Sequence, residues 1–181
     1  MPELPEVECS RKTLEDHCLN SKVVRVEAIE QGGGPRDGQF DDKVIDKDLA
    51  KDGFESALMG ASFGKFGRKG KILWCEMNDS EKSLVMHFGM TGQLSIKDVE
   101  LIQYRNSKSK REAGEWPPKF TKFVLEFENG TVLAFTDPRR MGRINIVSQI
   151  TDDPMICTLA PDPLFEIPAA EYWLEKLGKI S

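Results

Sequence analysis

A run of apolar residues around an Asn-Gly pair constrains the fold of this chain more than any other feature. Residues 123–135 read FVLEFENGTVLAF, with Asn129 and Gly130 at the centre. Aromatic and β-branched residues at this density favour strands, and Asn-Gly supplies the positive φ angles that a type I′ turn requires. The run therefore predicts an antiparallel β-hairpin.

Further short runs of strand-forming residues are separated by turn residues along the middle of the chain. We expect strands over residues 23–29, 71–77, 83–88, 93–96 and 120–128. Helices are expected at both ends, over residues 5–19 and 168–177. Pro5 suits a first helical turn, Asn20 a left-handed stop and Gly178 a helix end. This order predicts an α+β fold: a two-layered antiparallel β-sandwich flanked by two helices.

The domain organisation follows from where composition changes. Residues 1–150 are expected to form the sandwich domain, and residues 151–181 a linker and a short helix. Residues 31–42 are rich in glycine and polar groups, so we expect a mobile loop that is too polar to pack. Residues 106–118 are expected to form a charged surface insertion.

The net charge of −5 hides an uneven distribution. Residues 1–60 carry a net −6 and residues 144–181 a net −4, whereas residues 61–143 carry a net +5. The basic side chains of that middle segment include two clusters: Lys65, Arg68, Lys69 and Lys71, and then Arg139, Arg140 and Arg143. Such clusters are often only a solvated face, but a local basic surface on an acidic protein also binds phosphate.

Two classes of protein and two kinds of site are excluded. No apolar run approaches the ~20 residues needed to cross a bilayer, and the acidic opening lacks the features of a secretory signal. We therefore expect no membrane partner and no secretion. The histidines are few and the cysteines scattered, so neither a disulfide nor a zinc site is expected in this chain: Cys9, Cys18, Cys75 and Cys157.

Pro2 directly follows the initiator methionine, and a small residue there predicts removal of Met1 and a free secondary amine. An α-amino group has an ordinary pKa of about 8, against about 10.4 for lysine, so more of it is neutral near pH 7. Such an amine can attack a sugar C1′ and form an iminium, which permits strand-breaking elimination. Glu3 is suited to general acid and base roles. Alternatively, Pro2 and Pro5 only stiffen the terminus and Glu3 caps a helix.

Five ordered motifs cover the chain from end to end: MPELPEVE at 1–8, RKGKIL at 68–73, HFGMTG at 87–92, TDPRRMG at 136–142 and LAPDPL at 159–164. In this order they resemble the motifs of the formamidopyrimidine-DNA glycosylase (Fpg/Nei) family, in its N-terminal catalytic domain. The basic insertion before Trp116-Pro117 resembles the plant and fungal branch more than the bacterial one.

The resemblance implies base-excision DNA repair by a glycosylase and abasic-site lyase. Oxidised purines such as 8-oxoguanine and formamidopyrimidines would be removed through a Schiff base on Pro2, with β,δ-elimination of the strand. Lys71 matches the family's catalytic lysine, and Glu6 is either a second acid near the nucleophile or a complement to the helix dipole. The implied partner is double-stranded DNA with oxidised bases or abasic sites, bound by a monomer. The implied compartment is the nucleus in a eukaryote, otherwise the cytoplasm and nucleoid.

The resemblance also implies which side chains enter the duplex. An extruded nucleotide leaves a void, which the family fills with Met, Arg and Phe; the matching positions here are Met90, Arg139 and Met141. Met141 departs from the family's Phe. Loss of the ring should weaken stacking by ~1–3 kcal/mol, which affects lesion search or affinity more than chemistry.

The remaining basic residues of the motifs are expected at the phosphate backbone. Lys71 would hold the phosphate beside the extruded nucleotide, supported by Arg68 and Lys69, in a glycine-containing turn that lets the backbone approach. Arg140 is also expected to contact DNA. His87 either satisfies hydrogen bonds at a strand end or touches the sugar-phosphate backbone.

The family's second domain, a helix-two-turn-helix followed by a zinc finger or zincless hairpin, is not found in residues 1–181. No cofactor is therefore expected on this chain. A second hypothesis is that the chain is a truncated, catalytically weak or silent module that binds damaged DNA. A third, an RNA-binding β module, is disfavoured because paired aromatics on one strand face are lacking.

Overall fold

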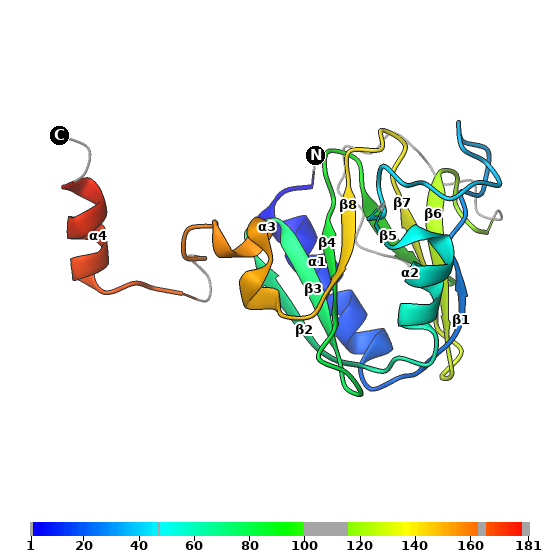
Figure 1. Ribbon diagram of the computed structural model, residues 1–181, viewed down its shortest axis with the longest axis horizontal. Coiled ribbons are helices and arrows are strands. Elements are labelled where there is room, and N and C mark those ends of the chain that lie inside the picture. The colour runs from blue at the N-terminus through cyan, green and yellow to red at the C-terminus, as the bar shows by residue number, and fades with distance from the viewer. Residues whose placement is uncertain (1, 47, 100–115, 163–165, 179–181) are drawn as a thin grey trace.

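The fold is a sandwich of two four-stranded antiparallel sheets, in a computed structural model that describes residues 2–46, 48–99, 116–162 and 166–178 (Figure 1). The first sheet has the order β1-β6-β7-β5, formed by Val23–Glu27, Thr121–Phe127, Val132–Thr136 and Gln93–Ile96. The second has the order β2-β3-β4-β8, formed by Phe63–Lys69, Ile72–Met77, Ser83–His87 and Arg143–Val147. The predicted fold class is confirmed.

The predicted hairpin is β6 and β7, but its turn differs from the expected type. Only Gly130 has a positive φ, of 85°, and its N–H donates to the Phe127 carbonyl at 2.9 Å. The connection therefore places Glu128 and Asn129 in a right-handed turn and gives Gly130 alone the left-handed conformation. The Asn129 side chain instead links the turn to the end of the first helix: it donates to the His17 carbonyl at 2.8 Å and accepts from the Thr131 N–H.

Strand β2 lies where the sequence indicated a glycine-containing basic turn. It pairs with β3 from Phe63 to Lys69, with one irregularity between Phe63 and Lys65, and Gly70, with φ of 56°, and Lys71 make the turn between the two strands. Gly67 lies under the Trp74 ring, where an added Cβ would come within 2.2 Å of the ring atoms. The glycine is thus needed for packing across the β2–β3 pair rather than for a loop.

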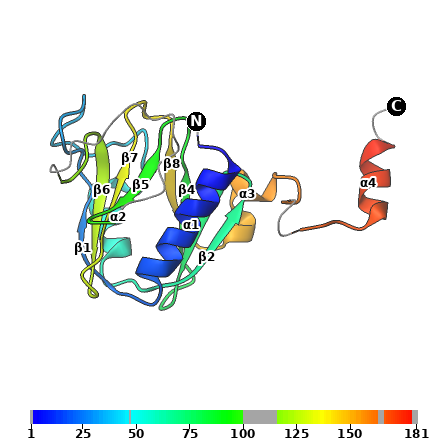
Figure 2. The same cartoon turned by 180° about the vertical axis from the view of Figure 1, so that it is seen from behind.

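One core fills the space between the sheets. The Phe63 ring of β2 contacts Phe127 of β6 at 5.6 Å between centroids, and Phe123 stacks on Phe135 at 5.7 Å. Helix α1, Leu4–Cys18, packs against β2 and β3, and its left-handed stop is Asn20 with φ of 55°, as expected. Helix α2, Ala50–Leu58, was not predicted; it covers β1 and buries Phe54 against Phe123. Figure 2 shows α1 lying along the second sheet.

The prediction that residues 31–42 are too polar to pack is wrong for Phe40 and Asp41, whereas most of residues 31–39 are exposed. Phe40 packs against the core, and Asp41 has no exposed surface. The Arg36 guanidinium donates to the Phe40 carbonyl at 2.9 Å. The backbone N–H of Arg36 donates to the Glu30 carboxylate at 3.2 Å. Partners within the fold satisfy Asp41 and part of the Arg36 guanidinium, whereas the Nε of Arg36 is buried without a hydrogen-bond partner among the described residues.

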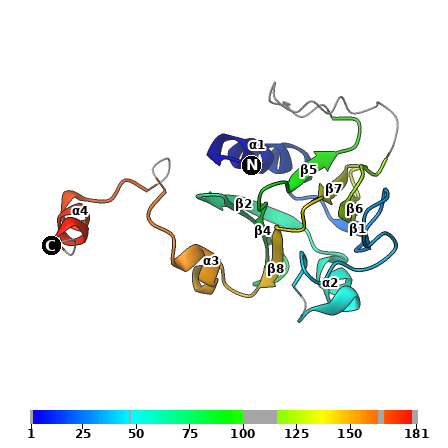
Figure 3. The same cartoon turned by 90° about the horizontal axis from the view of Figure 1, so that it is seen from above.

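The segment after β8 crosses the outside of the sandwich and then leaves it. A 3-10 turn, Ile150–Asp152, precedes the short helix α3, Pro154–Cys157, whose Ile156 packs on the second sheet. Helix α4, Ala170–Leu177, begins two residues later than expected and has no buried residue. Figures 1 and 3 show α4 standing apart from the sheets.

Parts of the sequence prediction fall outside the described residues, including the charged insertion through residue 115. The boundary at residue 150 stays a prediction. Within the described ranges, no helix combines the length and apolar character needed to cross a membrane.

Candidate functional site

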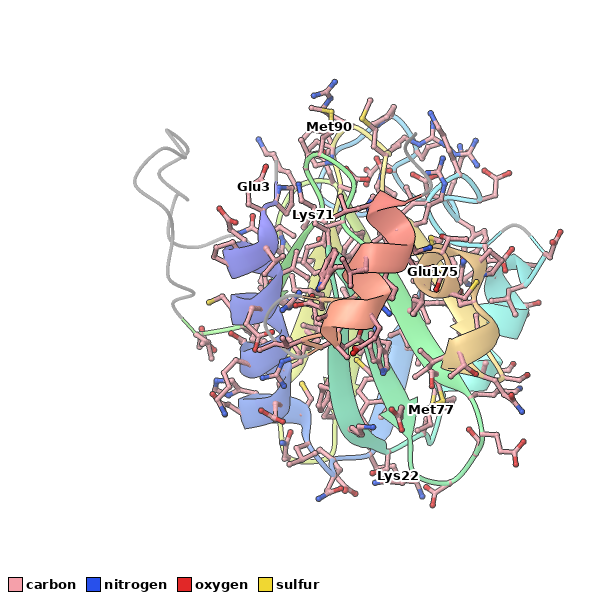
Figure 4. The ribbon with its side chains drawn as sticks, turned by 90° about the vertical axis from the view of Figure 1, so that its left-hand side faces the viewer. Glu3, Lys22, Lys71, Met77, Met90 and Glu175 are labelled. Carbon is pink, nitrogen blue, oxygen red and sulfur yellow. The ribbon has the colours of Figure 1, made fainter. Side chains whose placement is uncertain are left out.

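The beginning of the chain meets the β2–β3 turn at one end of the sandwich. Lys71 Nζ lies 2.9 Å from a Glu3 carboxylate oxygen, and both side chains are partly exposed, at 37% and 53%. Pro2 precedes Glu3 at the entry to α1. Figure 4 shows Glu3 and Lys71 side by side, with Met90 above them at the same end of the molecule. The fold therefore brings the predicted nucleophile, acid and lysine together.

Glu6 has a structural partner at the start of the first helix. Its carboxylate accepts a hydrogen bond from the Glu3 N–H at 2.9 Å, so it satisfies a backbone donor that the first turn leaves unpaired. This contact also holds Glu3 in an extended conformation, with φ of −96° and ψ of 178°. The geometry supports the helix-terminus role of Glu6, and its role as a second acid stays a prediction.

His87 lies at the end of β4, opposite Ile72 of β3 and Arg143 of β8. Burial lowers the pKa of its imidazole, and the positive charges of Arg143 and Lys71 lower it further. Its Nδ1 accepts a hydrogen bond from the Gly89 N–H at 3.3 Å. This contact fits the structural role at a strand end; contact with DNA stays a prediction.

The three residues expected to enter DNA are exposed on two neighbouring loops. Met90 lies on the loop between β4 and β5, and Arg139 and Met141 lie on the loop between β7 and β8. Met90 and Met141 keep 39% and 41% of their surface exposed, although both are large apolar side chains. Exposed apolar side chains flanked by Lys71 and Arg143 fit a surface that inserts into a base stack and grips phosphate.

The prediction that Arg68 contacts DNA phosphate is corrected by the structure. Its side chain has no exposed surface and bridges Glu8 of α1, at 2.9 Å, to Asp162 of the linker, at 2.6 Å. The Gly70 N–H donates to the same Asp162 carboxylate at 2.8 Å. Arg68 therefore anchors the linker, because a guanidinium enclosed by two carboxylates is not presented to a phosphate. Lys69 remains partly exposed and pairs with Glu166 at 3.2 Å.

Arg140 also has a partner within the protein, a buried group of charges that could not be predicted from the sequence. Its guanidinium donates to both oxygens of Asp41, at 2.8 Å each for the shortest contacts. Lys122 contacts Asp41 at 2.9 Å and also pairs with Glu30, and these three side chains have no exposed surface. Two carboxylates and two cations balance one another here, and they fix the loop that carries Arg139. These contacts give Arg140 a structural role, but 24% of its side chain stays exposed, so its expected DNA contact stays a prediction.

Acidification from pH 5 to pH 2.5 is expected to weaken this group of charges. Burial by itself raises the pKa of Asp41, but hydrogen bonds from Arg140 and Lys122 outweigh it and lower the pKa from 3.8 to about 2. A depressed pKa stabilises the fold above the unfolded value, and this stabilisation, about 2 kcal/mol, is lost as pH falls from about 4 to about 2. Urea unfolding across this range should show a steeper loss for the wild type than for Asp41→Asn. Parallel curves would contradict the assignment.

Three buried carboxylates accept hydrogen bonds that hold segments near the site in place, and none of them was predicted: Asp41, Asp137 and Asp162. Asp137 and Asp162 lie inside the recognised motifs, which is the only signal that pointed to them. Within the described ranges, no group of three His, Cys, Asp or Glu side chains is arranged to hold a metal ion.

Comparison with known proteins assigns the family. Residues 1–144 match the family described as the formamidopyrimidine-DNA glycosylase N-terminal domain. A formamidopyrimidine-DNA glycosylase of Arabidopsis thaliana is 36% identical over 99% of this chain and 43% of the relative. One from Teredinibacter turnerae is 32% identical over 100% of this chain and 57% of the relative.

A solved structure agrees on the fold. The Lactococcus lactis formamidopyrimidine-DNA glycosylase, bound non-covalently to DNA containing an abasic site, superposes with a TM-score of 0.68 at 24% identity. That match covers 98% of this chain and 57% of the solved chain. This chain thus spans about half the length of the relatives that it matches. The motifs, the fold and the match over residues 1–144 together show that the chain belongs to the formamidopyrimidine-DNA glycosylase family, through its N-terminal domain.

Proposed function

We propose that this protein binds DNA containing oxidised purines or abasic sites and acts on it as a glycosylase and abasic-site lyase. The observation that carries the proposal is the Glu3–Lys71 contact at 2.9 Å next to Pro2, at the end of the sandwich that also exposes Met90. An amine, a carboxylate and a cation within one small, partly exposed region are the groups that this chemistry needs.

In the proposed reaction the Pro2 nitrogen attacks C1′ of the damaged nucleotide. The bond from C1′ to the base breaks, and the base leaves with the electron pair and takes up the proton that the Pro2 nitrogen releases. Protonation of the ring oxygen by Glu3 opens the sugar and gives an iminium between Pro2 and C1′. Glu3, now ionised, takes the C2′ proton as the 3′ phosphate leaves, and loss of a further sugar proton expels the 5′ phosphate in a second elimination. Water then hydrolyses the iminium and frees Pro2. The proposed steps involve no metal or cofactor on this chain.

Lys71 has two proposed tasks in this scheme. It holds the Glu3 carboxylate in place, and its positive charge attracts the phosphate next to the extruded nucleotide. Lys69 and Arg143 add charge along the same edge. A genomic substrate implies the nucleus in a eukaryote, or the nucleoid in a bacterium.

The second candidate is a binding module with weak or no catalysis. It is favoured by one observation, that the exposed Met90 and Met141 could enter a duplex whether or not the Pro2 amine is free to react.

Borohydride trapping on a duplex with one abasic site separates the two candidates. If the protein is an enzyme, we expect a covalent adduct of the chain and DNA, detected by gel and by mass, once removal of Met1 has been verified. No adduct, together with binding that weakens steeply as salt rises, would support the binding module. Neither adduct nor binding at any salt would overturn both.

A further inference from the structure

The two loops that carry Met90, Arg139 and Met141 are linked by the topology of the sandwich. The loop of residues 88–92 leaves β4 of the second sheet and enters β5 of the first, while residues 137–142 run from β7 of the first to β8 of the second. Because β4 pairs with β8 and β5 pairs with β7, both loops cross between the sheets at the same end. They therefore lie next to one another.

One buried carboxylate joins these loops. Asp137 has no exposed surface, and its Oδ1 accepts from the Thr91 hydroxyl at 2.6 Å. Its Oδ2 accepts from the Gly142 N–H at 2.6 Å, and its Oδ1 from the Arg139 N–H at 3.3 Å. The Thr91 hydroxyl oxygen also accepts from the Arg139 N–H at 3.3 Å. The Thr91 side chain of the first loop therefore contacts the backbone of the second loop directly at Arg139 and, through Asp137, at Gly142.

The backbones of the two loops also touch. Gly89 has φ of 59°, and an added Cβ would lie 2.5 Å from the carbonyl carbon of Met141. Only glycine fits this conformation and this space without displacing the other loop. Gly89, the residue before Met90, therefore packs against the backbone of Met141.

We propose that Thr91 and Asp137 are positioning residues that hold Met90, Arg139 and Met141 as one preformed unit for entry into a duplex. The inference rests on the proposed binding of damaged DNA. The three side chains are exposed, so their relative placement comes from the backbone beneath them, and the Thr91–Asp137 contact fixes that backbone. Fixing side chains before binding lowers the entropic cost of inserting them.

The test compares the full chain with Thr91→Val, which keeps the side-chain shape and removes the hydroxyl. The probe is a duplex carrying a tetrahydrofuran abasic-site analogue, with 2-aminopurine on the opposite strand at the vacant pair; the reference is the undamaged duplex. We expect Thr91→Val to lose about tenfold of the preference for the damaged duplex and most of the 2-aminopurine fluorescence change. Affinity for undamaged DNA should change less than about twofold, because phosphate contacts remain.

Two further variants act as controls. Thr91→Ser keeps the hydroxyl and should restore both the preference and the fluorescence change. Thr131→Val removes a hydroxyl hydrogen bond to the His17 carbonyl, 3.2 Å long, at the β6–β7 turn. It should leave both readouts as in the wild type, although it removes a hydrogen bond of the same kind. If Thr91→Val does not fold, as judged by thermal unfolding, Thr91→Ala replaces it.

The outcomes distinguish the two proposals. A wild type without preference for the damaged duplex overturns the proposed function and this inference with it. If the wild type shows the preference and Thr91→Val retains it with the same fluorescence change, only the positioning role is overturned. Equal losses on damaged and undamaged DNA would show that Thr91 supports the fold alone, which also contradicts the inference.

Discussion

Retention of Met1 is expected to lower the yield of the borohydride-trapped adduct at least about 100-fold. With Met1 attached, the Pro2 nitrogen is part of a tertiary amide, so its lone pair is delocalised and cannot attack C1′. The remaining amine belongs to Met1 and lies one residue, about 3.8 Å of chain, away from the Pro2 position. The comparison uses one preparation before and after treatment with methionine aminopeptidase, with intact mass recorded for each and abasic DNA as the substrate.

Lys71 supplies the control for this experiment, because its amine lies within 2.9 Å of Glu3 and is the alternative nucleophile at this end of the molecule. Lys71→Arg keeps the positive charge and removes the nucleophilic amine. We expect Lys71→Arg, with Met1 removed, to keep forming an adduct. Trapping that survives with Met1 attached and disappears in Lys71→Arg would assign the nucleophile to Lys71 and contradict the role of Pro2.

Substitution of Arg68 is expected to lower stability while leaving the electrostatics of DNA binding unchanged. Arg68→Met removes the cation between Glu8 and Asp162 and leaves the Asp162 carboxylate, whose side chain is 1% exposed, without that partner. Removing one member of a buried ion pair costs about 3–5 kcal/mol. For a chain of this size we expect Tm to fall on the order of 10 °C, measured by circular dichroism.

The matched control is Lys69→Met, the next residue along β2. Its side chain is partly exposed and pairs with Glu166, so we expect a stability loss of about 1 kcal/mol or less. The effects on DNA binding are expected to be the opposite, with the larger change in the Lys69 variant. Lys69→Met should reduce the slope of log affinity against log salt by about one, and Arg68→Met should not change this slope. A reduced slope in Arg68→Met at a temperature where it is folded would restore Arg68 as a phosphate contact.

Features set by neighbouring residues could be predicted from the sequence. The first helix, its left-handed stop at Asn20 and the hairpin over residues 123–135 were expected and are present. Each depends on side chains within a few positions, which is the range over which caps and turns act. The turn at Gly130 shows the limit, because the Asn129 side chain is recruited by the His17 carbonyl.

Strand β2 shows how tertiary pairing overrides local preference. Glycines and lysines disfavour strands when considered alone, so the stretch around Gly67 was interpreted as a turn. In the folded chain β3 supplies the hydrogen bonds and the Trp74 ring fills the space above Gly67. Helix α2 was missed as well, because its apolar face is short and contains only two buried residues, Phe54 and Leu58.

The family and the chemical groups at the start of the chain are set by contiguous motifs, and the sandwich class follows from the order of strand-forming runs, so all three could be predicted from the sequence. Which basic residues pair with buried carboxylates could be seen only in the folded chain. Arg68 and Asp162 are 94 positions apart, and Arg140 and Asp41 are 99 apart, so no local pattern links them. An arginine looks the same in sequence whether it faces a phosphate or a buried carboxylate. Burial decides between the two, because a charge removed from water must be paired within the fold.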